Sequence, residues 1–123
     1  MSAVDQRREA LGAAPELQIT TYRDDGTTRR WTPIWVVLVD GELYVRSAYG
    51  GAGGWYRRAT TRGTARVRAG AVETDVTLEP VADEATRAAV GAAYEQKYAG
   101  SGSALATMLE PPAAGTTTRL VTS

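Results

Sequence analysis

The sequence predicts a mostly β protein: a β-barrel with helices, with about six strands, one main helix and short helices near the N-terminus and in a loop. Three observations support this fold class. The β-prone segments are short and evenly spaced, two of their connections carry hairpin signals at Asp40-Gly41 and Gly70, and a single long helical segment covers residues 83–98. Closing a sheet removes its exposed edges, so the pattern favours a closed or nearly closed barrel over an open sheet. The length of 123 residues fits a single domain, residues 1–123.

The first half of the chain alternates β-prone runs with turn signals. Residues 4–13 predict a short helix that ends at the Ala14-Pro15 step. An Asp-Asp-Gly turn at residues 24–26 and the Asp40-Gly41 hairpin separate the first three predicted strands. These strands are Leu17–Tyr22, Thr28–Val39 and Glu42–Ser47. The continuous apolar end of the second strand, Ile34–Val39, predicts burial on both faces.

The second half opens with a glycine-rich loop at residues 49–54, followed by a predicted short helix, Trp55–Thr61. Alternating segments then predict two strands joined at Gly70, a helix capped by Asp83, a helical turn and a final strand. Their bounds are Gly63–Ala69, Val72–Glu79, Asp83–Tyr98, Ser103–Glu110 and Thr116–Val121. Within the second of these strands, alternation places Val72, Thr74, Val76 and Leu78 on one face.

Composition excludes several kinds of chemistry. The chain has no cysteine and no histidine, so disulfides, thiolate catalysis and Ser-His-Asp or Cys-His machinery are impossible. The commonest protein metal ligands are missing with them, and no cluster of Asp and Glu indicates a carboxylate site. We therefore expect no metal.

Net charge and hydropathy indicate which partners and which cellular location to expect. Fourteen basic and fourteen acidic residues cancel, which argues against binding to nucleic acid or to a membrane surface. Met1 to Leu11 is charged and lacks the apolar region of a signal peptide, and no run reaches the length of a membrane span. We expect a cytoplasmic protein.

Three features within thirty residues indicate an anion site. Pro33 interrupts a β-prone run, so nearby backbone groups are free to meet a ligand. Arg46-Ser47 ends a strand before the glycine loop, whose backbone N–H groups can form an anion-binding nest. Trp55-Tyr56-Arg57-Arg58 then opens a helix, whose N-terminus favours an anion. The pattern matches neither the P-loop nor the Rossmann fingerprint. A flexible loop with solvated arginines accounts for the same residues.

Three strings carry a family resemblance: TPIWVVLVDGELYVRS at residues 32–47, GGWYRRA at 53–59 and AYEQKY at 93–98. They resemble the bacterial family known as domain of unknown function 2255. That family is similar to the flavin-binding split barrels, which include the pyridoxamine-phosphate-oxidase-like and deazaflavin-dependent nitroreductase groups. The resemblance runs from about Leu17 to Val121 and implies a split β-barrel.

The resemblance also implies a cofactor site. In the split barrels the phosphate end of the flavin meets an Arg and a Thr or Asn beside the strand proline, the strand-end Ser and the loop-helix after it. The corresponding residues here are Arg30, Thr32, Pro33, Ser47, Trp55 and Arg57. Trp35 corresponds to an aromatic position near the cofactor ring, and Arg46 fits the chemistry without a counterpart in the relatives.

The chain departs from its relatives at two places. Ser47-Ala48-Tyr49 replaces the Ser-Arg-Lys run of the pyridoxamine-type enzymes, and Asp24-Asp25-Gly26 stands where deazaflavin enzymes carry a lysine-bearing turn. The implied function is an oxidoreductase that uses FMN or F420 and works as a homodimer. Two alternatives stay open: a cofactor-binding module without turnover, and a flavin-free barrel that binds another small anion.

The helical motif Tyr94-Glu95-Gln96-Lys97-Tyr98 has two interpretations. In the first, a phenol and the ammonium of Lys97 point towards the cofactor. In the second, Tyr94 and Tyr98 pack on the barrel at i, i+4 spacing while Lys97 is solvated.

Overall fold

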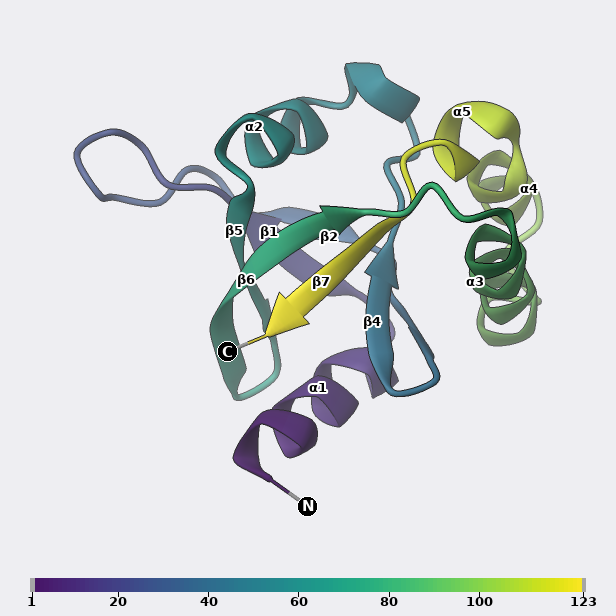
Figure 1. The fold of residues 1–123 in the computed structure, drawn as a ribbon, viewed down its shortest axis with the longest axis horizontal. Helices are drawn as coiled ribbons and strands as arrows, with labels where there is room; N and C mark the ends of the chain where they lie inside the picture. Colours follow the sequence, from purple (N-terminus) through teal and green to yellow (C-terminus); the bar gives the residue numbers. More distant parts are fainter. Residues whose placement is uncertain (1, 123) are drawn as a thin grey trace.

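Seven strands form one curled antiparallel sheet in the computed structural model, which describes residues 2–122 (Figure 1). Their order across the sheet is β2-β1-β5-β6-β7-β4-β3. Their bounds are β1 Leu17–Thr20, β2 Thr32–Ile34, β3 Val37–Val39, β4 Glu42–Val45, β5 Thr64–Ala69, β6 Val72–Pro80 and β7 Thr118–Thr122. The sheet forms a half-barrel with helices around it, so the predicted mostly β architecture with helices is confirmed.

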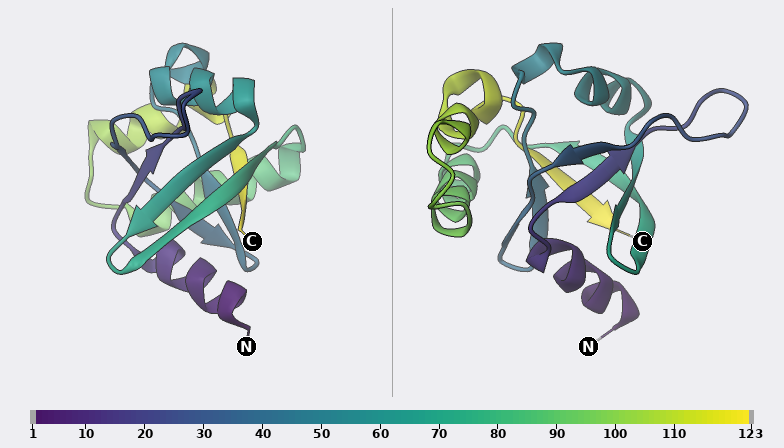
Figure 2. Two further views of the ribbon diagram at one scale, coloured as in Figure 1. Left: turned by 90° about the vertical axis from the view of Figure 1, so that its left-hand side faces the viewer. Right: turned by 180° about the vertical axis from the view of Figure 1, so that it is seen from behind.

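The helices surround the half-barrel on three sides. One lies below the sheet, another above it, and three pack together at its flank (Figures 1 and 2). In that order they are α1 Ala3–Ala13, α2 Gly54–Arg62, and α3 Glu84–Lys97 with α4 Ser103–Leu109 and α5 Pro111–Ala114. A short 3-10 turn at Gly50–Ala52 leads into α2. The predicted short helices, the capped main helix and the helical turn before Pro111 are all present, and α5 is an addition that the sequence analysis did not foresee.

The two edges of the sheet belong to one continuous stretch of chain. Strand β2 ends at Ile34 and β3 begins at Val37, yet the two strands lie at opposite ends of the strand order. Three residue steps span at most roughly 11 Å, so the sheet must curl until its edges almost meet. The barrel is therefore split between β2 and β3, with Trp35 and Val36 bridging the split.

This bridge corrects the predicted strand count. The prediction of a single strand over Thr28–Val39 is wrong, and dividing that segment raises the total from six to seven. Pro33 lies in the edge strand β2, where its missing N–H costs no ladder bond on the open side. Trp35 and Val36 then leave the sheet because side chains of α3, described below, take up their backbone groups.

Burial of the same segment also differs from the prediction. Val36 and Val37 are buried, but Leu38 is 37% exposed and Val39 is half-buried. Strand β3 has a neighbour, β4, on one side only, so it is not the doubly covered strand that the apolar run predicts. An apolar run predicts that some of its residues are buried, but it does not show whether the strand lies at the centre or at the edge of the sheet.

Both hairpin predictions are confirmed. Asp40 and Gly41 both adopt positive φ, 51° and 79°, between the paired residues Val39 and Glu42. This is the geometry of a two-residue type I′ turn. Between the paired residues Ala69 and Val72 only Gly70 adopts positive φ, 57°, which is the pattern of a two-residue type II′ turn. Val76 and Leu78 are buried and Val72 and Thr74 are half-buried, while the residues between them face solvent or lie at the surface.

Candidate functional site

The split in the barrel is sealed by the C-terminal end of α3. The Val36 N–H donates to the Tyr98 hydroxyl at 3.1 Å, and that hydroxyl lies 2.7 Å from the carbonyl of Pro15. Lys97 Nζ donates to three carbonyls, those of Gly12 at 2.8 Å, Ala14 at 2.6 Å and Val36 at 2.7 Å. The backbone groups released where the strand breaks are thus bonded by α3.

Aromatic rings reinforce this seal. Trp35 stacks on Tyr98 with ring centroids 4.0 Å apart and planes within 4°. Tyr94 is fully buried behind them, and burial raises the pKa of its hydroxyl. The interpretation that Tyr94 and Tyr98 pack on the barrel is confirmed. Lys97, however, is neither solvated nor directed at a ligand, because its three protons are donated to carbonyls, and burial lowers its pKa.

A cavity of about 250 Å³ opens beside the split, and we call it the tryptophan cavity after Trp35 and Trp55. Five of the eight residues named from the sequence line it: Thr32, Pro33, Trp35, Arg46 and Trp55. Glu16, Ile34, Ala48, Tyr49 and Met108 complete the lining. Tyr49 is 84% exposed, which places it at the rim. The sequence analysis missed Glu16 and Met108, which come from segments distant in sequence and carry no motif.

Ser47 lies next to this cavity, at the beginning of α2. Its backbone N–H donates to Thr116 Oγ1 at 2.8 Å, but its own hydroxyl is buried and has no hydrogen-bond partner among residues 2–122. A Cβ at Gly53 would collide with that hydroxyl. Gly53 is the N-cap of α2 and offers no side-chain cap, so the first N–H groups of the helix are left without one.

Arg46 lies between the barrel and the flanking helices. The residue is 3% exposed, and its guanidinium donates to Thr117 Oγ1 at 2.9 Å and to the carbonyls of Met108 at 3.0 Å and Arg87 at 2.8 Å. All three acceptors are uncharged, and burial lowers the pKa of the guanidinium. Arg46 therefore carries a positive charge at the wall of the tryptophan cavity while it links α3, α4 and the residue that precedes β7.

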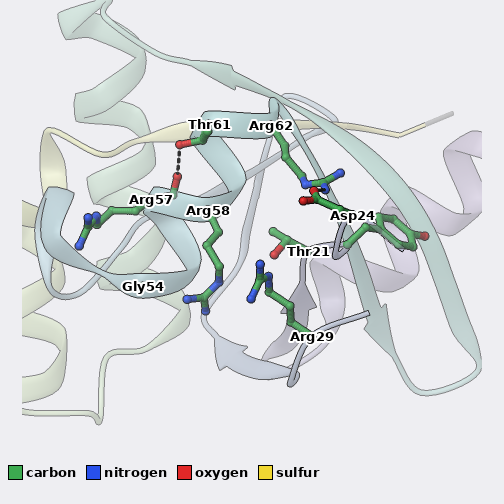
Figure 3. Close-up of a pocket in the computed structure, with 9 residues that line it drawn as sticks. Thr21, Asp24, Arg29, Gly54, Arg57, Arg58, Thr61 and Arg62 are labelled. Atoms are coloured by element: carbon green, nitrogen blue, oxygen red, sulfur yellow. Dashed lines mark hydrogen bonds and ion pairs between the residues drawn. The ribbon is translucent and has the colours of Figure 1, made fainter. Parts of the chain in front are cut away.

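A second cavity, of about 430 Å³, lies on the other side of α2 (Figure 3). We call it the arginine cavity. It is lined by Thr21, Tyr22, Asp24, Arg29, Gly54, Arg57, Arg58, Thr61 and Arg62. Arg57 is the only one of these that was named from the sequence as a site residue. Its guanidinium points away from those of Arg29 and Arg58, which turn towards one another (Figure 3).

Arg30 is the one predicted site residue that stands apart. Its side chain is exposed and lines neither cavity, and its carbonyl accepts from Thr20 Oγ1 at 3.2 Å. The neighbouring Arg29 lines the arginine cavity instead. Both arginines are exposed, and the course of this irregular segment decides which of the two borders the cavity. The sequence carried no signal for that choice.

The described residues offer no group of three or more Asp or Glu side chains able to hold a metal. Within residues 2–122, no helix is both long enough and apolar enough to cross a bilayer.

Several solved structures share this fold. An F420-H2 dependent reductase is similar with 18% identity over 87% of this chain and 93% of that chain, at a TM-score of 0.60. An FAD-binding protein from Mesorhizobium loti has 17% identity over 100% and 91%, at 0.58. A protein solved as a domain-swapped dimer has 16% identity over 96% and 92%, at 0.59. These likenesses establish the fold.

Comparison of the sequence with protein families identifies the family as well as the fold. Residues 8–120 match the family described as "Uncharacterized protein conserved in bacteria (DUF2255)", and the chain belongs to that family. The resemblance stated from the sequence is thereby confirmed. A comparison with curated protein sequences found no match.

Proposed function

We propose that the protein binds a phosphorylated flavin-type cofactor, FMN or F420, and acts as an oxidoreductase. The observation that carries the proposal is the unpartnered Ser47 hydroxyl beside Gly53, at the uncapped start of α2 and next to the tryptophan cavity. A buried hydroxyl without a partner costs roughly 1–3 kcal/mol, so a site that retains one is suited to a ligand that completes the hydrogen bond.

The phosphate end belongs at the start of α2. Helix N-termini bind anions through their free N–H groups and the helix dipole, and α2 begins with glycine on both sides of its N-terminal boundary. Ser47 Oγ would donate to the phosphate, and Arg57, which lies exposed in the first turns of the helix, would add a charged contact. Gly53 is needed because any larger residue would collide with the Ser47 hydroxyl.

The ring end belongs in the tryptophan cavity. Its volume of about 250 Å³ is below the roughly 300 Å³ at which whole small-molecule sites begin, so it suits the ring system alone. Pro33, Trp35 and Trp55 offer flat apolar faces for a ring, and the stack of Trp35 on Tyr98 fixes one of them in place. The buried charge of Arg46 favours electron-rich states of a ring bound beside it.

The cofactor would supply the hydride chemistry, so the lack of histidine and cysteine is no obstacle. The residues of this chain bind and orient the ring, exclude water from one of its faces and hold a positive charge at the cavity wall. We further propose a homodimer, because a second copy of the chain would cover the open side of a cavity that is too small for the whole cofactor. The likeness to a domain-swapped dimer supports an association between copies.

The experiment is a fluorescence titration of the purified chain with FMN, riboflavin and F420, with the dimer fraction measured in the same buffer. We expect saturable binding of FMN or F420 and much weaker binding of riboflavin. Arg57→Ala and Ser47→Ala should weaken FMN binding about tenfold with little effect on riboflavin, while the matched control Arg30→Ala leaves both unchanged.

Three outcomes would contradict parts of the proposal. If none of the three compounds binds, the cofactor proposal fails and a flavin-free barrel for another anion replaces it. Equal losses for FMN and riboflavin in Arg57→Ala would remove Arg57 from the phosphate site. Binding without reduction by NAD(P)H or reduced deazaflavin would make the protein a cofactor-binding module rather than an enzyme.

A further inference from the structure

We propose that the arginine cavity is a second ligand site, separate from the cofactor, and that it binds the phosphate group of a small molecule. The cavity lies across α2 from the tryptophan cavity, since Gly54 lines the first and Trp55 the second. The cofactor proposed above uses the Ser47 side of the helix. Arg57 borders both sides, but its guanidinium points away from those of Arg29 and Arg58 (Figure 3), which stay free for a second ligand.

The first argument is unbalanced charge. Arg29 and Arg58 face one another across the cavity, and no carboxylate among residues 2–122 forms an ion pair with either (Figure 3). Arg62 in the same cavity is paired, with Asp24 at 3.0 Å. The four arginines and one aspartate of the lining leave three positive charges in a chain whose overall charge is zero. Both side chains are exposed, so water and salt screen part of the repulsion between the two guanidinium groups, and an anion between them would remove the rest.

The second argument is independent of charge. Thr21 is 2% exposed and lines the cavity, and its hydroxyl has no hydrogen-bond partner within the described part of the chain. The hydroxyl points towards the space between Arg29 and Arg58 (Figure 3). The adjacent Thr20 makes the contrast clear, because its hydroxyl donates to the Arg29 carbonyl at 2.8 Å. Thr21 therefore retains a buried donor exactly beside the unbalanced charge, which is where an anion would accept from it.

These groups together select phosphate. Guanidinium forks match the spacing of phosphate oxygens and form paired hydrogen bonds with them. A phosphate dianion has enough oxygens for two arginines and a hydroxyl, whereas a single carboxylate has two. The cavity volume of about 430 Å³ leaves room for the body of a small molecule beyond its phosphate.

The test is isothermal titration of the full-length chain, without flavin, with inorganic phosphate and with pyrophosphate, using sodium chloride at matched ionic strength as the blank. We expect saturable binding of at least one of the two. Arg58→Gln and Thr21→Val should each weaken it roughly tenfold. Arg30→Gln is the matched control for charge, because it lies beside Arg29 but outside the cavity. Thr122→Val is the matched control for the hydroxyl, because Thr122 Oγ1 is also buried and unpartnered but distant from the cavity.

Three results would overturn the proposal. The first is heat no larger than that of the chloride blank. The second is saturable binding that Arg58→Gln and Thr21→Val do not weaken more than their controls. The third is a loss of FMN binding in Arg58→Gln and Thr21→Val, since that would assign the cavity to the cofactor. A failure of FMN to bind leaves the phosphate titration interpretable, so this proposal and the proposed function can fail separately.

Discussion

The two sides of the barrel differ in whether their polar side chains have hydrogen-bond partners. On the side of α3, Arg46 and Lys97 each donate to three acceptors, and the Tyr98 hydroxyl is bonded to the backbone at the split. Around the start of α2, the hydroxyls of Ser47 and Thr21 have no partner within residues 2–122, and Arg29 and Arg58 form no ion pair there.

The contrast separates structural cations from available ones. Arg46 is buried and Lys97 is half-buried, and each satisfies backbone carbonyls or a threonine hydroxyl that would otherwise be unpaired. They hold the split barrel closed. Arg29 and Arg58 form no ion pair among residues 2–122, and the buried, unpartnered hydroxyls of Ser47 and Thr21 each cost stability in the unliganded chain. Residue type alone does not reveal this division, because arginine occurs on both sides. The hydrogen bonds and ion pairs that each arginine forms distinguish the structural residues from the available ones.

The largest expected effect tests the structural side of the comparison. Arg46→Met removes the guanidinium that bonds Thr117, Met108 and Arg87, and it leaves their buried oxygens without a donor. We expect the free energy of unfolding to fall by about 3 kcal/mol. Urea denaturation followed by circular dichroism measures it.

The matched control for this substitution is Arg30→Met, an exposed arginine with the same change of charge and volume. Surface substitutions of this kind change stability by about 0.5 kcal/mol or less. Equal stabilities for the two variants would mean that the buried bonds of Arg46 contribute nothing, and the division drawn between the two sides would be wrong.

Local signals explain which parts of this fold were predictable. The Asp40-Gly41 turn, the Asp83 cap and the alternation along β6 each depend on neighbouring residues, and each was predicted correctly. The Asp83 carboxylate accepts from the Thr86 N–H at 2.7 Å, as an N-cap should. Such features follow from turn and cap chemistry that a few residues carry entirely.

The features that were missed depend on contacts distant in sequence. Nothing in residues 28–39 reveals that Tyr98 and Lys97, some sixty positions away, take up the backbone groups of Val36. The division of the strand follows from that contact. The same holds for the candidate sites. The family resemblance found five residues of the tryptophan cavity, and the Trp55–Arg58 motif predicted an anion site that includes Arg58, but nothing in the sequence indicated that the fold brings Arg29 and Thr21 to it.

The second prediction concerns the crowding at Ser47. Gly53 has φ −60° and ψ 131°, a conformation open to any residue, so the space taken by the Ser47 hydroxyl is what requires glycine. We expect Gly53→Ala to lower the free energy of unfolding by about 2 kcal/mol, because something must shift to admit the methyl group.

A double-mutant cycle decides whether the hydroxyl is the cause. In the Ser47→Ala background the hydroxyl is gone and the remaining neighbours of the added methyl group lie at 3.5 Å or beyond, so Gly53→Ala should cost about 1 kcal/mol less. A cost that is the same in both backgrounds would show that the glycine serves the backbone and not the hydroxyl.

The smallest expected effect tests the available side of the comparison. Arg58→Gln relieves the repulsion between Arg58 and Arg29 while keeping a residue of similar helix propensity, so we expect the unliganded chain to gain about 0.3 kcal/mol at low salt. The gain should vanish in 1 M sodium chloride, where charges are screened within about 3 Å.

Arg62→Gln on the same helix is the matched control and should have the opposite sign, because it breaks the pair with Asp24. Urea denaturation suits both variants, since urea leaves the ionic strength unchanged. If the two substitutions shift stability in the same direction, Arg58 already has a partner in the free protein, and the cavity holds no unbalanced charge for an anion to neutralise.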